Sequence, residues 1–293
     1  MRVEASVFLA DDLGKLDSAR ARAQADGRRV AFVATMGALH EGHRSLIRKA
    51  RELGDVVFVS IFVNPLQFGP NEDLDRYPRT LEADLAVCRE EGAEVVFVPT
   101  QDMIYPREPE VTVSSGRMGT IVEGACRPGH FDGVLTIVMK LFNLIRPEVA
   151  VFGEKDAQQL AVIRRMVADL ELPVEVVGCP TVREPDGLAL SSRNRFLSTT
   201  ERATALALSR ALWVGTQAVP AGPHEVVRAA QTILDEAVKA DPPLELDYLV
   251  LVDQDTFTEV DETYTGTAVL AVAGRVGTTH LIDNVILGFP PEG

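Results

Sequence analysis

A nine-residue stretch, Thr35–His43, constrains the fold of this chain more than any other part of its sequence. It follows an apolar run at residues 30–33 that is typical of a short buried strand. It precedes residues 44–53, in which the apolar side chains recur at helical spacing. Two glycines and two histidines, His40 and His43, therefore lie where a strand turns into a helix. Free N–H groups at such a turn, with two imidazoles on one helix face, predict a phosphate site that uses histidine in place of a P-loop lysine.

The first 177 residues alternate between helical and strand patterns. Helices are expected at residues 11–26, 44–53, 80–91, 132–145 and 157–170, and strands at 30–33, 56–63, 94–98, 149–152 and 174–177. Thr80 is placed to cap the third of these helices. The alternation predicts a doubly wound α/β domain with a parallel sheet over residues 1–177. Ligands bind beyond the carboxyl ends of the strands in such sheets. The polar clusters at 35–43, 64–67 and 153–156 each follow a strand, so we expect one cleft to collect them.

The pattern changes at about residue 178. A serine-rich basic loop, Ser191–Asn194, comes first. Helices are then expected at 199–218 and 224–240, and strands at 246–252, 263–265, 267–273 and 280–287. This order predicts a smaller α+β domain over residues 178–293. We expect it to close over the nucleotide cleft.

Composition and charge exclude several classes of protein. The net charge of −14 argues against general nucleic-acid binding, which requires a basic face. The longest apolar stretch, residues 56–63, is too short to span a bilayer, and residues 1–5 lack the apolar core of a signal peptide. The cysteines, Cys88, Cys126 and Cys179, are odd in number and widely spaced, which favours free thiols over a disulfide framework or a metal site. These features predict a cytoplasmic protein.

The histidine pair has two readings. Helical histidine pairs can bind zinc, but the zinc-protease helix spaces its histidines four apart, with a glutamate next to the first and no glycine between them. Here His40 and His43 are three apart, and Gly42 lies between them. Catalytic use against phosphate fits this pattern better, with imidazolium donating to oxygens whose charge grows in the transition state.

Two later clusters also suit phosphate. Lys155, in the turn Gly153–Asp156, is either a phosphate-binding lysine or part of a solvated charged turn. Asp156 would hold a ribose hydroxyl or a magnesium-bound water, or it would cap the following helix. The loop Ser191–Asn194 offers two hydroxyls and a guanidinium, whose planar donors suit phosphate oxygens, and its alternative is an exposed turn. The chain has no P-loop, dinucleotide fingerprint or nucleophile elbow.

With these motifs in view, the chain resembles the nucleotidylyltransferase superfamily related to class I aminoacyl-tRNA synthetases. It is most similar there to the pantoate–beta-alanine ligase (pantothenate synthetase) family. The blocks that carry the resemblance are residues 35–43, 62–68, 76–80, 127–134, 152–156 and 190–194. They occur in the family's order within residues 30–197, and the similarity is weaker beyond. Ala34 and Ala157 replace a proline and an aromatic residue that are usual in the family, and neither change removes a group with a chemical role.

The resemblance implies a Rossmann-like nucleotidylyltransferase domain that condenses (R)-pantoate with beta-alanine in an ATP-dependent reaction. Pantoate would first form a pantoyl adenylate and release pyrophosphate, and beta-alanine would then displace AMP. The resemblance further implies Mg²⁺ as cofactor and a homodimer, with small-molecule substrates and no nucleic-acid or membrane partner.

The resemblance also implies site residues. His40 and His43 would contact the ATP phosphates, with His43 as the proton donor, and the catalytic set would include Lys155, Ser191, Ser192 and Arg193. The ATP site would comprise Met36, Gly37, Ala38, Leu39, His40, Glu41, Gly42, His43, Gly153, Glu154, Lys155, Asp156, Val182, Leu190, Ser191, Ser192 and Arg193. Pantoate would contact Gln67, Gln159, Asn64, Arg127 and His130, with Gln67 also near beta-alanine. Asp84 would help to hold magnesium.

Two rival functions differ in what they require of these residues. Another adenylyltransferase or cytidylyltransferase would use the histidines on a different acceptor, and the pair Gln67 and Gln159 with the block 127–130 argues for pantoate. A catalytically idle nucleotide-binding or regulatory protein would not need to keep all its phosphate-binding groups. Their retention, with Lys155 and Arg193 beside the histidines, argues for an enzyme.

Overall fold

The computed structural model describes residues 7–69, 74 and 77–290. Arg76, in one of the motif blocks, lies outside them. The chain forms two compact units. The first contains the residues up to Thr120, with Arg127–Glu154 and Val162–Pro180, and the second contains Ile121–Cys126, Lys155–Ala161 and the residues from Thr181 onward. The division expected at residue 177 stays a prediction.

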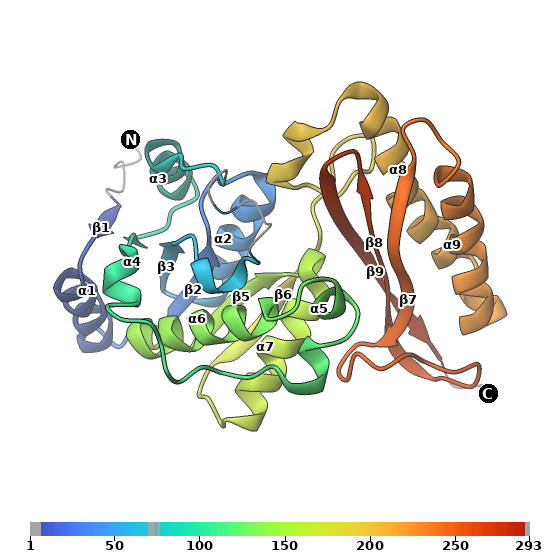
Figure 1. The fold of residues 1–293 in the computed structure, drawn as a ribbon. Helices are drawn as coiled ribbons and strands as arrows, with labels where there is room; N and C mark the ends of the chain where they lie inside the picture. The colour runs from blue at the N-terminus through green and yellow to red at the C-terminus, as the bar shows by residue number, and fades with distance from the viewer. Residues whose placement is uncertain (1–6, 70–73, 75–76, 291–293) are drawn as a thin grey trace. The chain divides into compact units, whose positions relative to one another are not determined.

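A parallel sheet of six strands forms the centre of the first unit (Figure 1). Its strands are β1 (Phe8–Ala10), β2 (Val30–Thr35), β3 (Val56–Ile61), β4 (Val95–Phe97), β5 (Val149–Gly153) and β6 (Glu175–Cys179), in the order β1-β4-β3-β2-β5-β6. All residues of β3 are buried, as its run of apolar and β-branched side chains predicts for a strand covered on both faces. The predicted doubly wound α/β fold is confirmed. Strand β1 was missed because it is only three residues long and half exposed.

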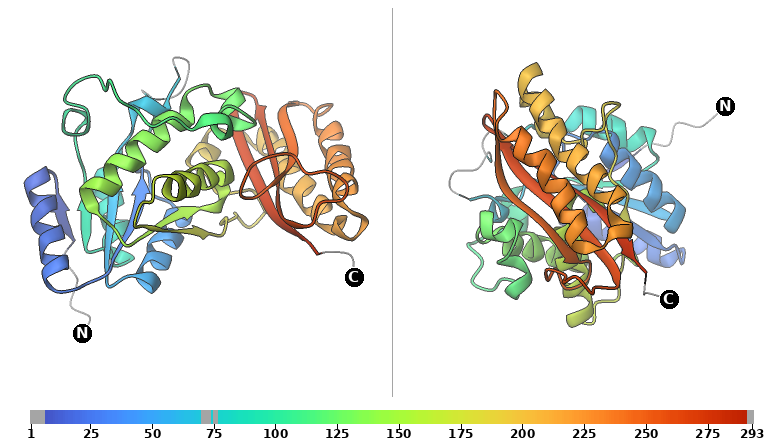
Figure 2. Two further views of the ribbon diagram at one scale, coloured as in Figure 1. Left: turned by 90° about the horizontal axis from the view of Figure 1, so that it is seen from below. Right: turned by 90° about the vertical axis from the view of Figure 1, so that its right-hand side faces the viewer.

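Helices cover both faces of this sheet (Figures 1 and 2). The helices of the chain up to β6 are α1 (Leu13–Ala25), α2 (Glu41–Leu53), α3 (Leu81–Glu90), α4 (Gln101–Ile104), α5 (Glu123–Cys126), α6 (His130–Ile145) and α7 (Ala157–Asp169). On one face, Ile47 of α2 and Cys88 of α3 belong to a buried cluster with alternate strand residues. On the other face, Phe142 of α6 packs edge-on against Phe32 and Phe152, with ring centroids 6.4 Å apart in both pairs. Strand β2 lies where the strand order reverses, between β3 and β5.

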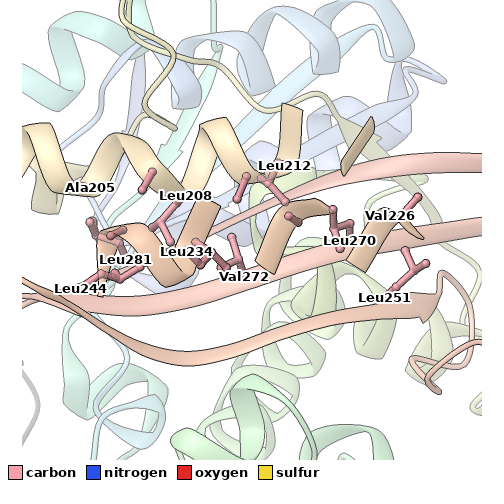
Figure 3. Close-up of a cluster of buried hydrophobic side chains, with 14 of the residues drawn as sticks. Ala205, Leu208, Leu212, Val226, Leu234, Leu244, Leu251, Leu270, Val272 and Leu281 are labelled. Carbon is pink, nitrogen blue, oxygen red and sulfur yellow. The ribbon is translucent and has the colours of Figure 1, made fainter. Parts of the chain in front are cut away.

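The second unit is a smaller α+β structure. Helices α8 (Thr199–Gln217) and α9 (Pro223–Ala237) pack on the antiparallel sheet of β7 (Leu244–Asp253), β8 (Gly266–Val276) and β9 (Thr279–Phe289). Figure 3 shows their shared apolar core. The strand expected at 263–265 is wrong. The Asp261 carboxylate accepts hydrogen bonds from the N–H and the hydroxyl of Thr263, at 2.9 and 2.7 Å, and so closes a turn.

Among the residues that the structure describes, no helix combines the length and the apolar composition needed to cross a bilayer.

Candidate active site

The histidine motif lies at the topological switch point of the parallel sheet. Strand β2 ends at Thr35, and helix α2 begins at Glu41. Between them, Gly37 and Ala38 both have left-handed backbones, with φ angles of 85° and 51°. Glycine adopts such angles freely, whereas an alanine there costs about 1 kcal/mol. This turn therefore needs contacts from elsewhere in the unit to hold it.

Asp84, at the start of α3, supplies those contacts. Its Oδ1 accepts a hydrogen bond from the N–H of Leu39 at 2.8 Å, and its Oδ2 accepts one from the N–H of Ala38 at 3.1 Å. The Thr80 hydroxyl donates to the same Oδ2 at 3.2 Å, so Thr80 does not cap α3 with its side chain as expected. Asp84 is 2% exposed. These contacts make it an anchor of the histidine turn, and its role toward magnesium stays a prediction.

The two histidines cap helix α2 reciprocally. His40 is the N-cap residue, and its Nδ1 accepts a hydrogen bond from the N–H of Gly42 at 3.2 Å. The Nδ1 of His43 in turn accepts from the N–H of His40 at 3.2 Å. The ring centroids are 4.1 Å apart. Glycine fits at position 42 without displacing the ring, because a Cβ there would lie 3.0 Å from Cε1 of His40.

This capping determines which nitrogen of each ring bears hydrogen. An Nδ1 that accepts from a backbone N–H carries no proton, so a neutral ring carries its proton on Nε2. An imidazolium has hydrogen on both nitrogens and could not accept these bonds. The hydrogen bonds of His40 and His43 therefore describe neutral rings that carry their proton on Nε2, and the imidazolium expected to act in the transition state stays a prediction. Neutral N–H donors can still stabilise charge that grows on phosphate oxygens.

Gln67 lies in the turn that follows β3, and both ends of the residue are held. Its side-chain Nε2 donates to the sulfur of Met36 at 3.2 Å, and its Oε1 accepts from Nδ2 of Asn64 at 3.2 Å. Its main-chain oxygen lies 2.8 Å from Nδ1 of His130 and 3.4 Å from Nη2 of Arg127. Because His130 donates from Nδ1 to a carbonyl, its Nε2 accepts from Arg127, 3.1 Å away. The structure thus brings Gln67, Asn64, Arg127 and His130 together, next to the histidine turn.

Asn64 and Gly133 set the position of the Gln67 turn. Asn64 is 1% exposed, donates to the carbonyl of Gly133 at 3.1 Å and accepts from the Tyr105 hydroxyl at 2.9 Å. Burial raises the pKa of Tyr105 to about 12, so this hydroxyl stays a donor at neutral pH. A Cβ on Gly133 would lie 2.2 Å from the carbonyl oxygen of Leu66, so only glycine allows α6 to approach this closely. These contacts give Asn64 a positioning role, and its contact with pantoate stays a prediction.

The second unit holds the predicted lysine and its neighbours. Lys155 and Asp156 lie in a single 3-10 turn, Glu154–Asp156, ahead of α7. The carbonyl of Lys155 accepts a hydrogen bond from Nδ2 of Asn284 at 2.8 Å. Gln159 is half-buried in the first turn of α7. Its role in pantoate binding stays a prediction.

The remaining predicted residues lie in and after a short hairpin of the second unit. Val182 and Leu190 face each other across it, joined by a hydrogen bond from the N–H of Leu190 to the Val182 carbonyl at 3.0 Å. Ser191 then caps a 3-10 helix, Ser192–Phe196, by accepting from the N–H of Arg193 at 3.3 Å. The structure brings the two expected adenine-side residues together and places the serine-rich loop directly after them.

Over the described ranges, no group of three or more His, Cys, Asp or Glu side chains is placed to bind a metal ion. Buried polar residues that sequence reasoning missed are Asp84, which holds the histidine turn, and the pair Asp283 and Asn284, which contact Arg183 and the Lys155 turn. The signal for that pair was two polar residues in an otherwise apolar strand pattern.

A parallel α/β sheet with a histidine-capped helix at its switch point is an arrangement suited to binding nucleotide phosphates. Comparison with known proteins is more specific. A family model described as pantoate-beta-alanine ligase matches residues 9–286. The chain therefore belongs to the pantoate–beta-alanine ligase family.

Individual relatives agree over nearly the whole chain. A pantothenate synthetase of Thermobifida fusca is 64% identical over 265 residues, which cover 88% of this chain and 90% of that protein. The crystal structure of pantothenate synthetase from Thermus thermophilus is 43% identical, with a TM-score of 0.88 over 97% of this chain and all of that one. A pantoate-beta-alanine ligase from Francisella tularensis, complexed with beta-gamma ATP and beta-alanine, is 33% identical, with a TM-score of 0.77 over 96% of this chain and 97% of that one.

Proposed function

We propose that this chain condenses pantoate with beta-alanine in an ATP-dependent reaction. The pantoate carboxylate attacks the α-phosphorus of ATP, the bond to the bridging oxygen breaks, and pyrophosphate leaves. The amine of beta-alanine then attacks the carbonyl of pantoyl adenylate, loses a proton and displaces AMP. Family membership supports the reaction. The single structural observation that supports the chemistry is the pair of histidines whose capping leaves Nε2–H as the donor of each ring.

In the first unit, we assign the phosphates to His40 and His43. The negative charge that moves onto pyrophosphate as the adenylate forms needs preorganised donors, and two neutral N–H groups supply them without prior proton uptake. In its neutral state His43 donates a hydrogen bond from Nε2, and the proton-donor role expected for it requires its ring to take up a proton first. Gln67 binds pantoate and lies near beta-alanine, and its contact with Met36 of the histidine turn supports this place for the acid. Arg127 and His130 hold the Gln67 main chain and complete the pantoate side.

In the second unit, we assign the nucleotide to three segments. Lys155 contacts phosphate, and Asp156 contacts the ribose. Val182 and Leu190, which the hairpin holds opposite each other, contact adenine. Ser191, Ser192 and Arg193 donate to the phosphates, and Gln159 contributes to pantoate binding.

The cofactor, the assembly and the location complete the proposal. Mg²⁺ accompanies ATP and neutralises part of its charge, and Asp84 is the carboxylate that sequence similarity suggests for it. The protein acts as a homodimer in the cytoplasm, where its three free cysteines would stay reduced.

The reaction is tested by mixing purified protein with ATP, Mg²⁺, pantoate and beta-alanine and measuring AMP. We expect AMP to form only when both pantoate and beta-alanine are present, and pyrophosphate exchange to require pantoate alone. AMP formation that ignores the omission of either substrate would overturn the proposal. An idle nucleotide-binding protein would form no AMP under any of these conditions.

The role of His43 is tested with two substitutions. His43→Ala should slow adenylate formation by about a hundredfold or more, as the loss of one preorganised donor commonly does. His43→Asn retains an oxygen that can accept from the His40 N–H but lacks the Nε2 donor, so it should be equally slow and nearly as stable as the parent protein. His224→Ala, at an exposed position of α9, is the control. A His43→Asn enzyme with normal single-turnover chemistry would reduce His43 to a helix cap.

A further inference from the structure

Strand β9 carries two adjacent buried polar residues that the reaction scheme does not use. Asp283 is 3% exposed and Asn284 is 6% exposed. Their partners across the strand pair are Val272 and Ala271, which offer no polar side chain. Buried polar groups need hydrogen-bond partners, so those of this pair must come from outside the sheet.

Asp283 holds the hairpin that ends at the serine-rich loop. Its carboxylate forms a bidentate ion pair with Arg183, at 2.7 Å from Nη1 to Oδ2 and 2.9 Å from Nη2 to Oδ1. The same guanidinium donates to the carbonyl of Gly187 at 3.0 Å and to that of Asn284 at 3.4 Å. Arg183 thus joins its own arm and the turn of the hairpin to β9. The fork geometry of arginine restricts rotation as well as distance, so the hairpin is fixed in orientation.

Asn284 holds the turn that carries the predicted phosphate-binding lysine. Its Nδ2 donates to the carbonyl of Lys155 at 2.8 Å. Its own N–H donates to Oδ1 of Asp283 at 2.8 Å, so the two residues also hold each other. One rigid strand therefore contacts two segments that lie far apart in the sequence, the 3-10 turn at 154–156 and the hairpin at 182–190.

We propose that Asp283 and Asn284 are positioning residues of the ATP site, which set the place of the Lys155 turn relative to the hairpin that leads into Ser191–Arg193. The proposal rests on the nucleotide contacts assigned above. A lysine and a serine-rich loop that must reach one triphosphate need a fixed spacing, and misplacement by about 1 Å can cost up to a hundredfold in rate. A strand that holds the backbone of the Lys155 turn and, through the Arg183 side chain, the hairpin provides that spacing without itself touching the substrate.

The first test separates positioning from stability. Asn284→Ala and Asp283→Asn should slow pantoate-dependent pyrophosphate exchange by between about tenfold and a hundredfold, with the KM for beta-alanine unchanged. Val285→Ala is the matched control, because Val285 lies on the same strand and packs on the apolar core. Each protein is assayed well below its own unfolding temperature. If the variants and the control lose only thermal stability and keep the parental exchange rate, the pair is structural and the proposal fails.

The second test asks whether Asn284 acts through Lys155. Lys155→Ala removes the ammonium but keeps the carbonyl that Asn284 holds. If positioning is the role, Asn284→Ala should slow exchange in the parent enzyme but change it less than about threefold when Lys155 is already alanine, because coupled residues are not additive. Equal effects in both backgrounds would overturn the proposal. The parent and Lys155→Ala arms test the underlying function separately: an inactive parent would refute the reaction, and an active Lys155→Ala enzyme would refute the role of the lysine.

Discussion

Asp84→Asn is the most direct test of how the histidine turn is held. The substitution preserves the shape of the side chain and replaces one carboxylate oxygen with an amide. The remaining oxygen can still accept from the N–H of Leu39, while the new NH₂ group can donate to the Thr80 hydroxyl. The same NH₂ group then faces the N–H of Ala38, so two donors meet where the parent protein has a 3.1 Å hydrogen bond.

The size of the effect follows from that lost bond. A hydrogen bond to a charged group contributes about 1.5–3 kcal/mol to stability. Here that contribution offsets the strain of the left-handed Ala38 backbone. A penalty of about 2 kcal/mol would let the turn relax and carry His40 with it. If that penalty recurs each time the turn is brought into the reactive geometry, adenylate formation slows by about thirtyfold.

The assay is single-turnover release of pyrophosphate, followed by rapid quench, with thermal unfolding measured in parallel. Glu82→Gln is the matched control because it removes the same charge from the same helical turn at an exposed position. We expect the control to behave as the parent protein in both measurements. The Asp84→Asn enzyme should be slow at every Mg²⁺ concentration.

Two results would refute this reasoning. A parental rate in Asp84→Asn would show that the turn does not need the carboxylate. A slow enzyme whose rate returns to normal at high Mg²⁺ would show that Asp84 acts on the metal, as sequence similarity suggests, and not on the backbone.

Two further predictions concern the packing around the site. Hydrogen bonds from Arg48 and Arg44, at 2.7 Å each, hold the pKa of Glu91 below its usual range. The stability that these bonds contribute is therefore complete above pH 4.5 and is lost as the pH falls through the lower pKa of folded Glu91. Glu91→Gln should lower the free energy of unfolding by about 1 kcal/mol at pH 7. If the difference between the two proteins in urea unfolding does not shrink in acid, the prediction is contradicted. Gly133→Ala would place a Cβ 2.2 Å from the Leu66 carbonyl oxygen, so we expect a loss of about 1–3 kcal/mol in stability. The KM for pantoate should rise more than the KM for ATP, and equal rises in the two KM values would contradict this prediction.

Much of the fold could be predicted from the sequence because its signals are local. The apolar runs of β2, β3 and β5 and the polar clusters that follow them placed the site at one edge of a parallel sheet, and the sheet order confirms that these three strands are neighbours. Where a local signal was ambiguous, the prediction was wrong. Residues 263–265 are rich in β-branched side chains, but the Asp261 carboxylate turns the chain there.

The partners of the buried polar residues Asp84 and Asn284 could not be predicted, because each contact joins residues far apart in the sequence. Asp84 lies 45 and 46 positions after the amides it holds, and Asn284 lies 129 positions after Lys155. An acidic residue in the first turn of a helix is ordinary, and only the fold reveals that Asp84 is buried against another turn. The protonated nitrogen of each histidine was likewise hidden, because it follows from a backbone hydrogen bond that spacing alone does not specify.

The spacing of the histidine motif follows from helix capping. A capping box joins the N-cap residue to the third residue of the helix, and His40 and His43 occupy those two positions of α2. Serine and glutamate would satisfy the same backbone groups, but they have no second polar atom fixed on the far side of a rigid ring. Histidine uses Nδ1 for the cap and keeps a hydrogen on Nε2, so one pair of side chains both starts the helix and presents donors away from it. Glycine between them leaves the His40 ring in place, whereas a Cβ at position 42 would lie 3.0 Å from that ring and push against it. A zinc-binding pair on a helix instead has its histidines at i and i+4, on one face, with no role in capping required of them.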